Sequence, residues 1–241
     1  MKHFDMPVMD PPPREFIDQR LSDKQVLKRD GHYVYASRKH GPDYFAKDVA
    51  LCDPWLAAAL GFDLAAHLIT TDGLIIVGPA TAGIALAHHV SDAAARRRPG
   101  VDYLTLYADK EGDRFVFKRG YDRLVKDRLV VVVEDVGTTG GSAKQVVEVV
   151  RRHGGNVVAV GLICNRGRLT AETFGVKNFY AFLELDLPQY PALDCPLCLE
   201  GRPISTELGH GRDWVERFGQ PPYDHLTQAN IAVYCAGNDK R

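Results

Sequence analysis

Short apolar runs alternate with segments of helical periodicity along most of the chain. The apolar runs suit strands that are buried on both faces of a parallel sheet. Segments between them repeat apolar positions at helical spacing, most clearly at 83–94 and 142–150. The pattern predicts strands at 74–77, 101–107, 130–133, 157–164 and 179–185. Strands that alternate with helices predict the α/β class, a parallel sheet flanked by helices, with binding sites beyond the carboxyl ends of the strands.

The first sixty residues carry weaker patterns. Residues 1–14 are rich in proline and indicate an irregular arm. Helix signals follow over 14–27, and a short strand is predicted at 31–35. A turn is expected at 38–43, and a further helix begins at Pro54. These segments give the chain an entry region that differs in kind from the alternating part after residue 60.

The stretch 130–142 reads VVVVEDVGTTGGS and carries the clearest chemistry. A buried strand brings two acids, Glu134 and Asp135, to its carboxyl end, and a loop rich in glycine and hydroxyl groups then opens a helix at Ser142. Unpaired amides and the positive end of the helix dipole favour an anion there. A carboxylate pair repels polyphosphate but suits sugar hydroxyls. The loop therefore predicts a sugar phosphate ligand, against the simpler reading of an ordinary β–α turn.

Two other glycine-loop motifs do not match this stretch. A P-loop ends in Gly-Lys-Ser/Thr, whereas Gly141 is followed directly by Ser142. The dinucleotide motif needs G-x-G-x-x-G, and Gly137, Gly140 and Gly141 have a different spacing. Neither an NTPase nor a dinucleotide enzyme is therefore indicated.

Two more segments extend the predicted site along the same edge. The small-residue loop 78–83 lies between a strand and a helix and can bind a second anion, such as pyrophosphate. The charged segment 106–125 contains Lys110, Lys118 and Arg119, with a possible edge strand at 114–118. It is either a solvated hairpin or a mobile cationic lid that would exclude water from an activated sugar.

Composition narrows the class of protein only slightly. The 241 residues carry a net charge of −1, so no overall field favours nucleic acid or a membrane. No apolar run approaches the length of a membrane span, and the start lacks a signal-peptide core. Five cysteines form no disulfide-like framework. We expect a cytoplasmic protein without nucleic-acid or membrane partners.

These motifs resemble those of type I phosphoribosyltransferases, which use phosphoribosyl pyrophosphate (PRPP). The acids and loop of 130–142 are similar to the PRPP motif of that family, and GPATAGIALA at 78–87 is similar to its pyrophosphate loop. The resemblance implies that Glu134 and Asp135 approach the ribose and act in catalysis with Lys110. It implies a 5-phosphate site at Val136, Gly137, Thr138, Thr139, Gly140, Gly141 and Ser142. It implies pyrophosphate contacts at Gly78, Pro79, Ala80, Thr81, Ala82, Gly83, Lys118 and Arg119.

Within that family, orotate phosphoribosyltransferases give the nearest resemblance, over about residues 20 to 205. It rests on GHYVYAS at 31–37 with His40 and Tyr44, on YADKE at 107–111, on ICNR at 163–166, and on the CPLC of 195–198. It implies base contacts at Lys28, Tyr44, Phe45 and Arg166. The chain departs from the family pattern at Arg38, Ala82, Asp109 and Asn165, and the Lys-x-His-Gly of the catalytic loop is replaced by Lys118-Arg119-Gly120-Tyr121.

The resemblance also implies an activity and an architecture. The enzyme would transfer ribose 5-phosphate from PRPP to a base, orotate first, in pyrimidine nucleotide biosynthesis, and release pyrophosphate. A purine or other base, or a non-catalytic PRPP-binding regulator, are the alternatives. Mg²⁺ would be held through PRPP near the two acids, with no site made of protein ligands alone, and the enzyme would be a homodimer. One domain, 1–241, would comprise a core at 61–185 and a small hood from 15–60 and 186–241.

Cys195 and Cys198 form a CxxC pair with two interpretations. The pair could be half of a zinc site completed by His210, His225 or Cys235, but structural zinc usually takes four ligands in recognisable pairs. A packed carboxyl-terminal loop is therefore favoured.

Overall fold

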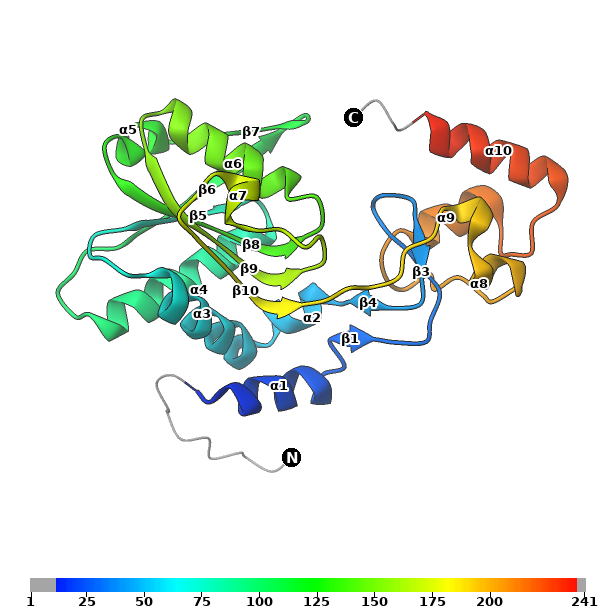
Figure 1. The fold of residues 1–241 in the computed structure, drawn as a ribbon, viewed down its shortest axis with the longest axis horizontal. Helices are drawn as coiled ribbons and strands as arrows, with labels where there is room; N and C mark the ends of the chain where they lie inside the picture. The colour runs from blue at the N-terminus through cyan, green and yellow to red at the C-terminus, as the bar shows by residue number, and fades with distance from the viewer. Residues whose placement is uncertain (1–11, 238–241) are drawn as a thin grey trace. The chain divides into compact units, whose positions relative to one another are not determined.

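The computed structural model describes residues 12–237, and these form two compact units (Figure 1). Unit 1 comprises the described residues of 12–24 and 47–186. Unit 2 comprises 25–46 and 187–237. Most of the arm predicted at 1–14 lies outside the described residues, and within the described part the first helix begins at Arg14.

Unit 1 is built on a six-stranded sheet with the order β10-β9-β8-β5-β6-β7. The strands pair in parallel, except that β7 runs antiparallel to β6 at the sheet edge. The bounds are β5 Ile75–Pro79, β6 Leu104–Glu111, β7 Arg114–Val116, β8 Leu129–Gly137, β9 Asn156–Asn165 and β10 Asn178–Glu184. The predicted α/β class, and each predicted strand of the sheet, is confirmed.

Helices cover both faces of this sheet (Figure 1). Helices α3 (Pro54–Leu68) and α4 (Ala82–Arg97) lie on one face, and Leu64 and Leu68 of α3 pack closely over Gly161 of β9. Helix α6 (Gly141–Arg152) covers the other face with its buried valines. Shorter helices complete the unit: α1 Arg14–Asp23, α2 Lys47–Cys52, α5 Tyr121–Val125 and α7 Ala171–Phe174. Burial of aliphatic side chains between these layers supplies the main stabilisation of unit 1.

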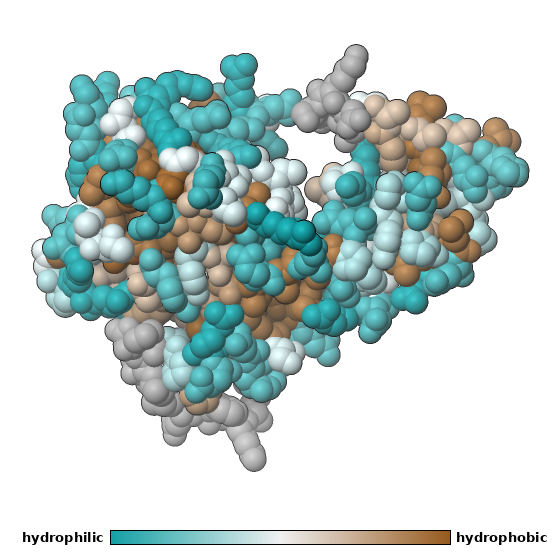
Figure 2. All heavy atoms as spheres, in the orientation of Figure 1, coloured by the Kyte–Doolittle hydropathy of each residue, from teal (hydrophilic) through white to brown (hydrophobic). Residues whose placement is uncertain are grey.

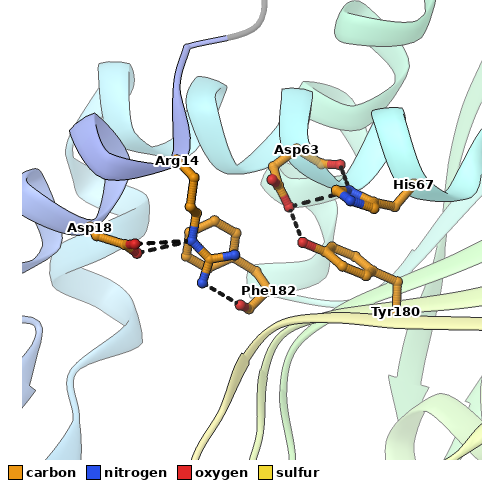
Figure 3. A network of polar contacts seen from close by, with 6 residues as sticks. All are labelled: Arg14, Asp18, Asp63, His67, Tyr180 and Phe182. Carbon is orange, nitrogen blue, oxygen red and sulfur yellow. Dashed lines mark hydrogen bonds and ion pairs between the residues drawn. The ribbon is translucent and has the colours of Figure 1, made fainter.

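Polar contacts fasten α1 and α3 to strand β10 (Figure 3). The guanidinium of Arg14 lies 3.6 Å from the ring centroid of Phe182 and donates to its carbonyl at 2.8 Å. The Tyr180 hydroxyl donates to Asp63 at 2.6 Å, and His67 stacks on the Tyr180 ring. Residues 15–24 and 47–60, which we expected in the hood, lie in unit 1. The contacts of Arg14 hold α1 on β10, and α3 buries Leu56 and Leu60 together with the rest of its apolar face.

Unit 2 is made of short elements from two distant chain segments. In the first, β1 (Leu27–Lys28) pairs with β4 (Tyr44–Phe45), and β2 (Tyr33–Val34) pairs with β3 (His40–Gly41). The second contains η1 Ala192–Asp194, α8 Pro196–Leu199, α9 Gly211–Phe218 and α10 His225–Ala236. Backbone hydrogen bonds between His40 and Tyr190 join the two segments.

The apolar core of unit 2 is small. It gathers round Trp214, with Val34 and Ile231 among its buried members. Helix α10 buries Ile231 but leaves Leu226 and Val233 exposed by 77% and 74%, and hydrophobic residues show at the surface over this helix (Figure 2). The described residues contain no helix that is both long and apolar enough to cross a membrane.

Candidate functional site

The loop after β8 has the geometry of an anion cradle. Strand β8 ends at Gly137, and α6 begins at Gly141 after Gly140, whose φ of +72° is a left-handed conformation that favours glycine. The side chain of Thr139 accepts from the Gly141 amide at 3.3 Å. The amides of the first turn of α6 thus open onto the residues predicted to hold the 5-phosphate, 136–142.

Two carboxylates lie buried beside this loop at the end of β8. One oxygen of Asp135 accepts from the amide of Val136 at 2.6 Å, and the other is 2.5 Å from the ammonium of Lys47. Glu134 accepts hydrogen bonds from the hydroxyl of Ser142 and the amide of Ala143, so it ties the strand to the first turn of α6. Asp135 is therefore fixed in place and balanced by one cation.

Lys47 was not predicted as a site residue; it begins α2 and lies 88 positions from Asp135 in the chain. Its side chain is 35% exposed, whereas that of Asp135 is 8% exposed. The signal available in the sequence was a lysine close to the predicted base residues Tyr44 and Phe45, but nothing local connects it to a carboxylate.

The two acids differ in their electrostatic surroundings. Burial in the first place, together with the adjacent charge of Asp135, raises the pKa of Glu134 to about 7. The hydrogen bonds from Ser142 and Ala143 and the charge of Lys47 act in the opposite direction. At neutral pH Glu134 is thus protonated in part of the molecules, where it can donate a hydrogen bond, and ionised in the others, where it can only accept.

The second glycine loop is held by a close approach of backbone to backbone. A Cβ on Gly78 would lie 2.0 Å from the carbonyl oxygen of Gly83, and a Cβ on Gly83 would lie 2.6 Å from the Pro79 ring. Only glycines allow the end of β5 to pack so tightly against the start of α4. The Ala80 amide donates to the carbonyl of Ala108 at 2.9 Å, which fixes the loop to β6. The predicted pyrophosphate residues 78–83 thus form one rigid turn.

Asn165, at the end of β9, organises a third loop on the same edge. Its side-chain oxygen accepts from the amides of Gly167 and Leu169, and its amide nitrogen donates to the Leu169 carbonyl. A Cβ on Gly167 would lie 1.5 Å from the carbonyl oxygen of Thr138, so this loop packs directly on the 5-phosphate loop. In the sequence Asn165 is a departure from the family pattern, and its hydrogen bonds to this loop were not predicted.

Strand register brings these loops to one edge of the sheet. Gly137 of β8 lies opposite Asn165 of β9, and the Arg166 amide donates to the Gly137 carbonyl at 2.8 Å. The parallel neighbour β5 carries the loop of 78–83 at the same end. Glu134, Asp135, both anion loops and the half-buried Arg166 therefore converge in unit 1.

The charged segment 106–125 forms a β-hairpin followed by α5. The ammonium of Lys118 lies 2.7 Å from Glu111, and Arg119 pairs with Asp109 and lies over the Tyr107 ring. Lys110 is exposed on β6. Two of the cations predicted to contact pyrophosphate are thus engaged by acids of the hairpin itself, and these ion pairs raise the pKa of both.

The remaining predicted base residues, Lys28, Tyr44 and Phe45, belong to unit 2. The Lys28 ammonium donates to Gln25 at 3.3 Å, the rings of Tyr44 and Tyr33 are 5.4 Å apart, and Phe45 is buried. The three residues lie together on the paired strands β1 and β4.

Comparison with known proteins identifies orotate phosphoribosyltransferases among the relatives of this chain. The orotate phosphoribosyltransferase of Thermotoga maritima is 37% identical over 194 residues, which span 78% of this chain and 98% of that protein. That of Caldanaerobacter subterraneus subsp. tengcongensis is 36% identical over 76% of this chain and 92% of its own length. No family model matches the chain.

Solved structures share the fold. The orotate phosphoribosyltransferase of Mycobacterium tuberculosis H37Rv, in a crystal structure with PRPP, aligns with a TM-score of 0.55 at 21% identity. The alignment covers 72% of this chain and 97% of that one.

Proposed function

The chain belongs to the orotate phosphoribosyltransferase family, and we propose on that basis that it transfers ribose 5-phosphate from PRPP to orotate and releases pyrophosphate. The observation that carries the proposal is the buried pair Glu134 and Asp135, held at the end of β8 between two glycine loops. Such a site suits a sugar that carries phosphate at one end and pyrophosphate at the other. The product would serve pyrimidine nucleotide synthesis.

Each loop at this edge of the sheet has a task in this reaction. The loop 136–142 binds the 5-phosphate through amides and hydroxyls, and the loop 78–83 binds pyrophosphate. The transition state of glycosyl transfer resembles an oxocarbenium ion, with positive charge developing at the anomeric carbon. Asp135 and Glu134 bind the ribose hydroxyls and stabilise that charge, because they are preorganised and shielded from water. Lys47 holds the Asp135 carboxylate in position.

The two acids also fit a magnesium ion brought by the substrate. Magnesium prefers oxygen ligands and keeps several waters, and here two buried carboxyl groups stand beside the ribose position. Because Asp135 is already paired with Lys47 and Glu134 is partly protonated at neutral pH, most ligands must come from PRPP and water. When bound, the ion neutralises charge on the leaving pyrophosphate.

The choice of base is the least constrained part of the proposal. Arg166 directly follows β9, at the sheet edge that carries the two acids and the two anion loops, and its guanidinium suits a planar carboxylate such as that of orotate. A different heterocycle, or PRPP binding without transfer, are the competing outcomes. We also expect a homodimer, as the family resemblance implies, and a reducing cytoplasmic environment, in keeping with the free thiols of the described chain.

One assay separates these possibilities. The full chain is incubated with PRPP and Mg²⁺ and with orotate, uracil, adenine, guanine or hypoxanthine in turn, and pyrophosphate release is followed. Release with orotate alone is the expected result. Release of pyrophosphate with another base and not with orotate would show that this base, in place of orotate, is the acceptor. Binding of PRPP by calorimetry without release for any base would make the protein a PRPP-binding regulator.

A further inference from the structure

Four buried side chains with metal-binding atoms meet in unit 2, a unit that lacks the phosphate loops of the sheet. They are His32, His40, Cys195 and Cys198, and all of their ligand atoms lie within 4.8 Å of one another. His32 precedes β2 and His40 begins β3, whereas the cysteines flank the start of the short helix α8. A β-hairpin and a CxxC turn, far apart in the chain, thus present two ligands each.

The distances between these atoms agree with a tetrahedral site. With zinc bonds of about 2.3 Å to sulfur and about 2.05 Å to nitrogen, tetrahedral angles place two nitrogens about 3.3 Å apart, and nitrogen and sulfur about 3.6 Å apart. Here His32 Nε2 lies 3.0 Å from His40 Nδ1. Cys198 Sγ lies 3.2 Å from His40 Nδ1 and 3.6 Å from His32 Nε2, and Cys195 Sγ lies 3.8 Å from His32 Nε2.

The orientation of the His32 ring also suits metal binding. Its Nδ1 lies 2.7 Å from the carbonyl oxygen of Arg202, which can only accept, so Nδ1 must donate. The neutral ring then turns the lone pair of Nε2 toward the other three ligand atoms. A backbone carbonyl that orients a ligand histidine in this way is a usual outer partner of zinc sites. The His40 ring, in turn, packs edge-on against Trp214 at 4.6 Å.

The architecture of unit 2 indicates that a bound metal would stabilise it. Its core is small, its strands are two residues long, and α10 buries Ile231 alone among its described residues. Small domains with limited cores commonly need a metal or a disulfide for stability. The four side chains connect the segments 25–46 and 187–237 at one buried point.

We infer that unit 2 holds one structural zinc ion, bound by Nε2 of His32, Nδ1 of His40 and the sulfurs of Cys195 and Cys198. Two thiolates and two imidazoles in tetrahedral array select zinc over magnesium or calcium, which prefer oxygen. The four protein ligands close the coordination sphere, so the ion has a structural and not a catalytic role. The histidine partners differ from His210 and His225, which the sequence suggested, because the hairpin of residues 32–41 brings its own pair to the cysteines.

The test begins with metal content. The full chain is purified without a histidine tag, under reducing conditions and without chelator. The number of zinc ions per chain is then measured by inductively coupled plasma mass spectrometry. One zinc per chain is expected, and X-ray absorption should show two sulfur and two nitrogen neighbours. Replacement of the zinc by cobalt(II) should give the intense visible absorption of tetrahedral cobalt thiolate.

Variants and a wild-type control assign the ligands. Cys195→Ser and Cys198→Ser should lose the metal and the cobalt spectrum, whereas Cys52→Ser, at an exposed cysteine of α2, should keep both. If a ligand variant fails to fold, titration of the thiols in the wild type still shows whether the two cysteines bind the metal. Cys195 and Cys198 should resist a thiol reagent with zinc present and react after chelation.

Three results would overturn the inference. The first is a reduced protein that takes up neither zinc nor cobalt. The second is a Cys195–Cys198 disulfide in the isolated protein whose reduction restores no metal binding. The third is an unchanged metal content and spectrum in both Cys195→Ser and Cys198→Ser.

Discussion

The two units of the molecule are stabilised in different ways. In unit 1, aliphatic residues from β5, β8, β9 and α6 form one extended core, and the polar site sits at its edge. In unit 2, apolar packing round Trp214 is limited, and two histidines and two cysteines occupy buried positions beside it. Unit 1 can therefore fold on hydrophobic burial, whereas unit 2 depends on a bound ion.

Removal of the metal is expected to give the largest difference between the units. Structural zinc contributes on the order of 10 kcal/mol to the folding of small zinc domains. Chelation should therefore speed amide exchange strongly in 25–46 and 190–236, while β8 and β9 keep their protection. Hydrogen exchange with mass spectrometry measures both regions in one sample. Equal loss of protection in both units would show that unit 1 depends on the ion as much as unit 2 does, and no loss in either would show that the ion has no structural role.

The buried acid Glu134 should make unit 1 sensitive to pH. The pKa of Glu134 is raised from 4.5 to about 7 in the folded protein. Below pH 4.5 this side chain is protonated in both the folded and the unfolded chain, so the wild type and Glu134→Gln should have similar free energies of unfolding there. Between pH 4.5 and 7 the unfolded chain ionises first, so the free energy of unfolding of the wild type should fall relative to that of Glu134→Gln, by about 3 kcal/mol in all, and the difference should level off above pH 7. Urea unfolding at several pH values measures this. The exposed Glu148→Gln in α6 is the control and should show no such trend.

The contact between the loops of β8 and β9 should matter for activity more than for folding. A Cβ on Gly167 would meet the Thr138 carbonyl at 1.5 Å, so Gly167→Ala must displace the 5-phosphate loop. A shift of about 1 Å in a binding loop costs roughly 100-fold in rate. We expect kcat/KM for PRPP to fall by about that factor with the circular dichroism spectrum unchanged. Gly237→Ala, where the nearest atom is 3.6 Å away, should have no effect.

The hairpin of β6 and β7 should give the smallest effect on stability. Its ion pairs, such as Lys118 with Glu111, are exposed, and exposed pairs stabilise proteins little. Lys118→Ala should leave the melting temperature unchanged. If the hairpin contacts pyrophosphate, the same variant should raise the KM for PRPP about tenfold, the usual cost of a charged hydrogen bond. An unchanged KM would make the segment a solvated hairpin.

The sequence predicts unit 1 far better than unit 2, and the reason is physical. The four valines of β8 and the spacing of α6 are local patterns, so the strand, the loop and both acids could be placed without a structure. The β7 edge strand was likewise visible in the sequence.

Long-range pairings were beyond prediction. Lys47 meets Asp135 only through the packing of α2, and His32 and His40 meet Cys195 across most of the chain. The CxxC was recognised, but its partners carried no helical or strand periodicity that would link them to it. The helix predicted at 14–27 ends at Asp23, because Lys24 caps it and Gln25 has a φ of +50°.

The assignment of the β8 edge as the transferase site is tested by the turnover of Asp135→Asn with PRPP, Mg²⁺ and orotate, measured beside PRPP binding and thermal stability. The substitution keeps the shape of the side chain, removes the charge that stabilises the oxocarbenium ion and loosens the hold of Lys47. We expect pyrophosphate release to fall at least 100-fold while the protein remains folded and binds PRPP, and we expect the control Asp102→Asn, at an exposed residue, to be fully active. Turnover of Asp135→Asn at the wild-type rate would contradict the assignment of the β8 edge as the transferase site.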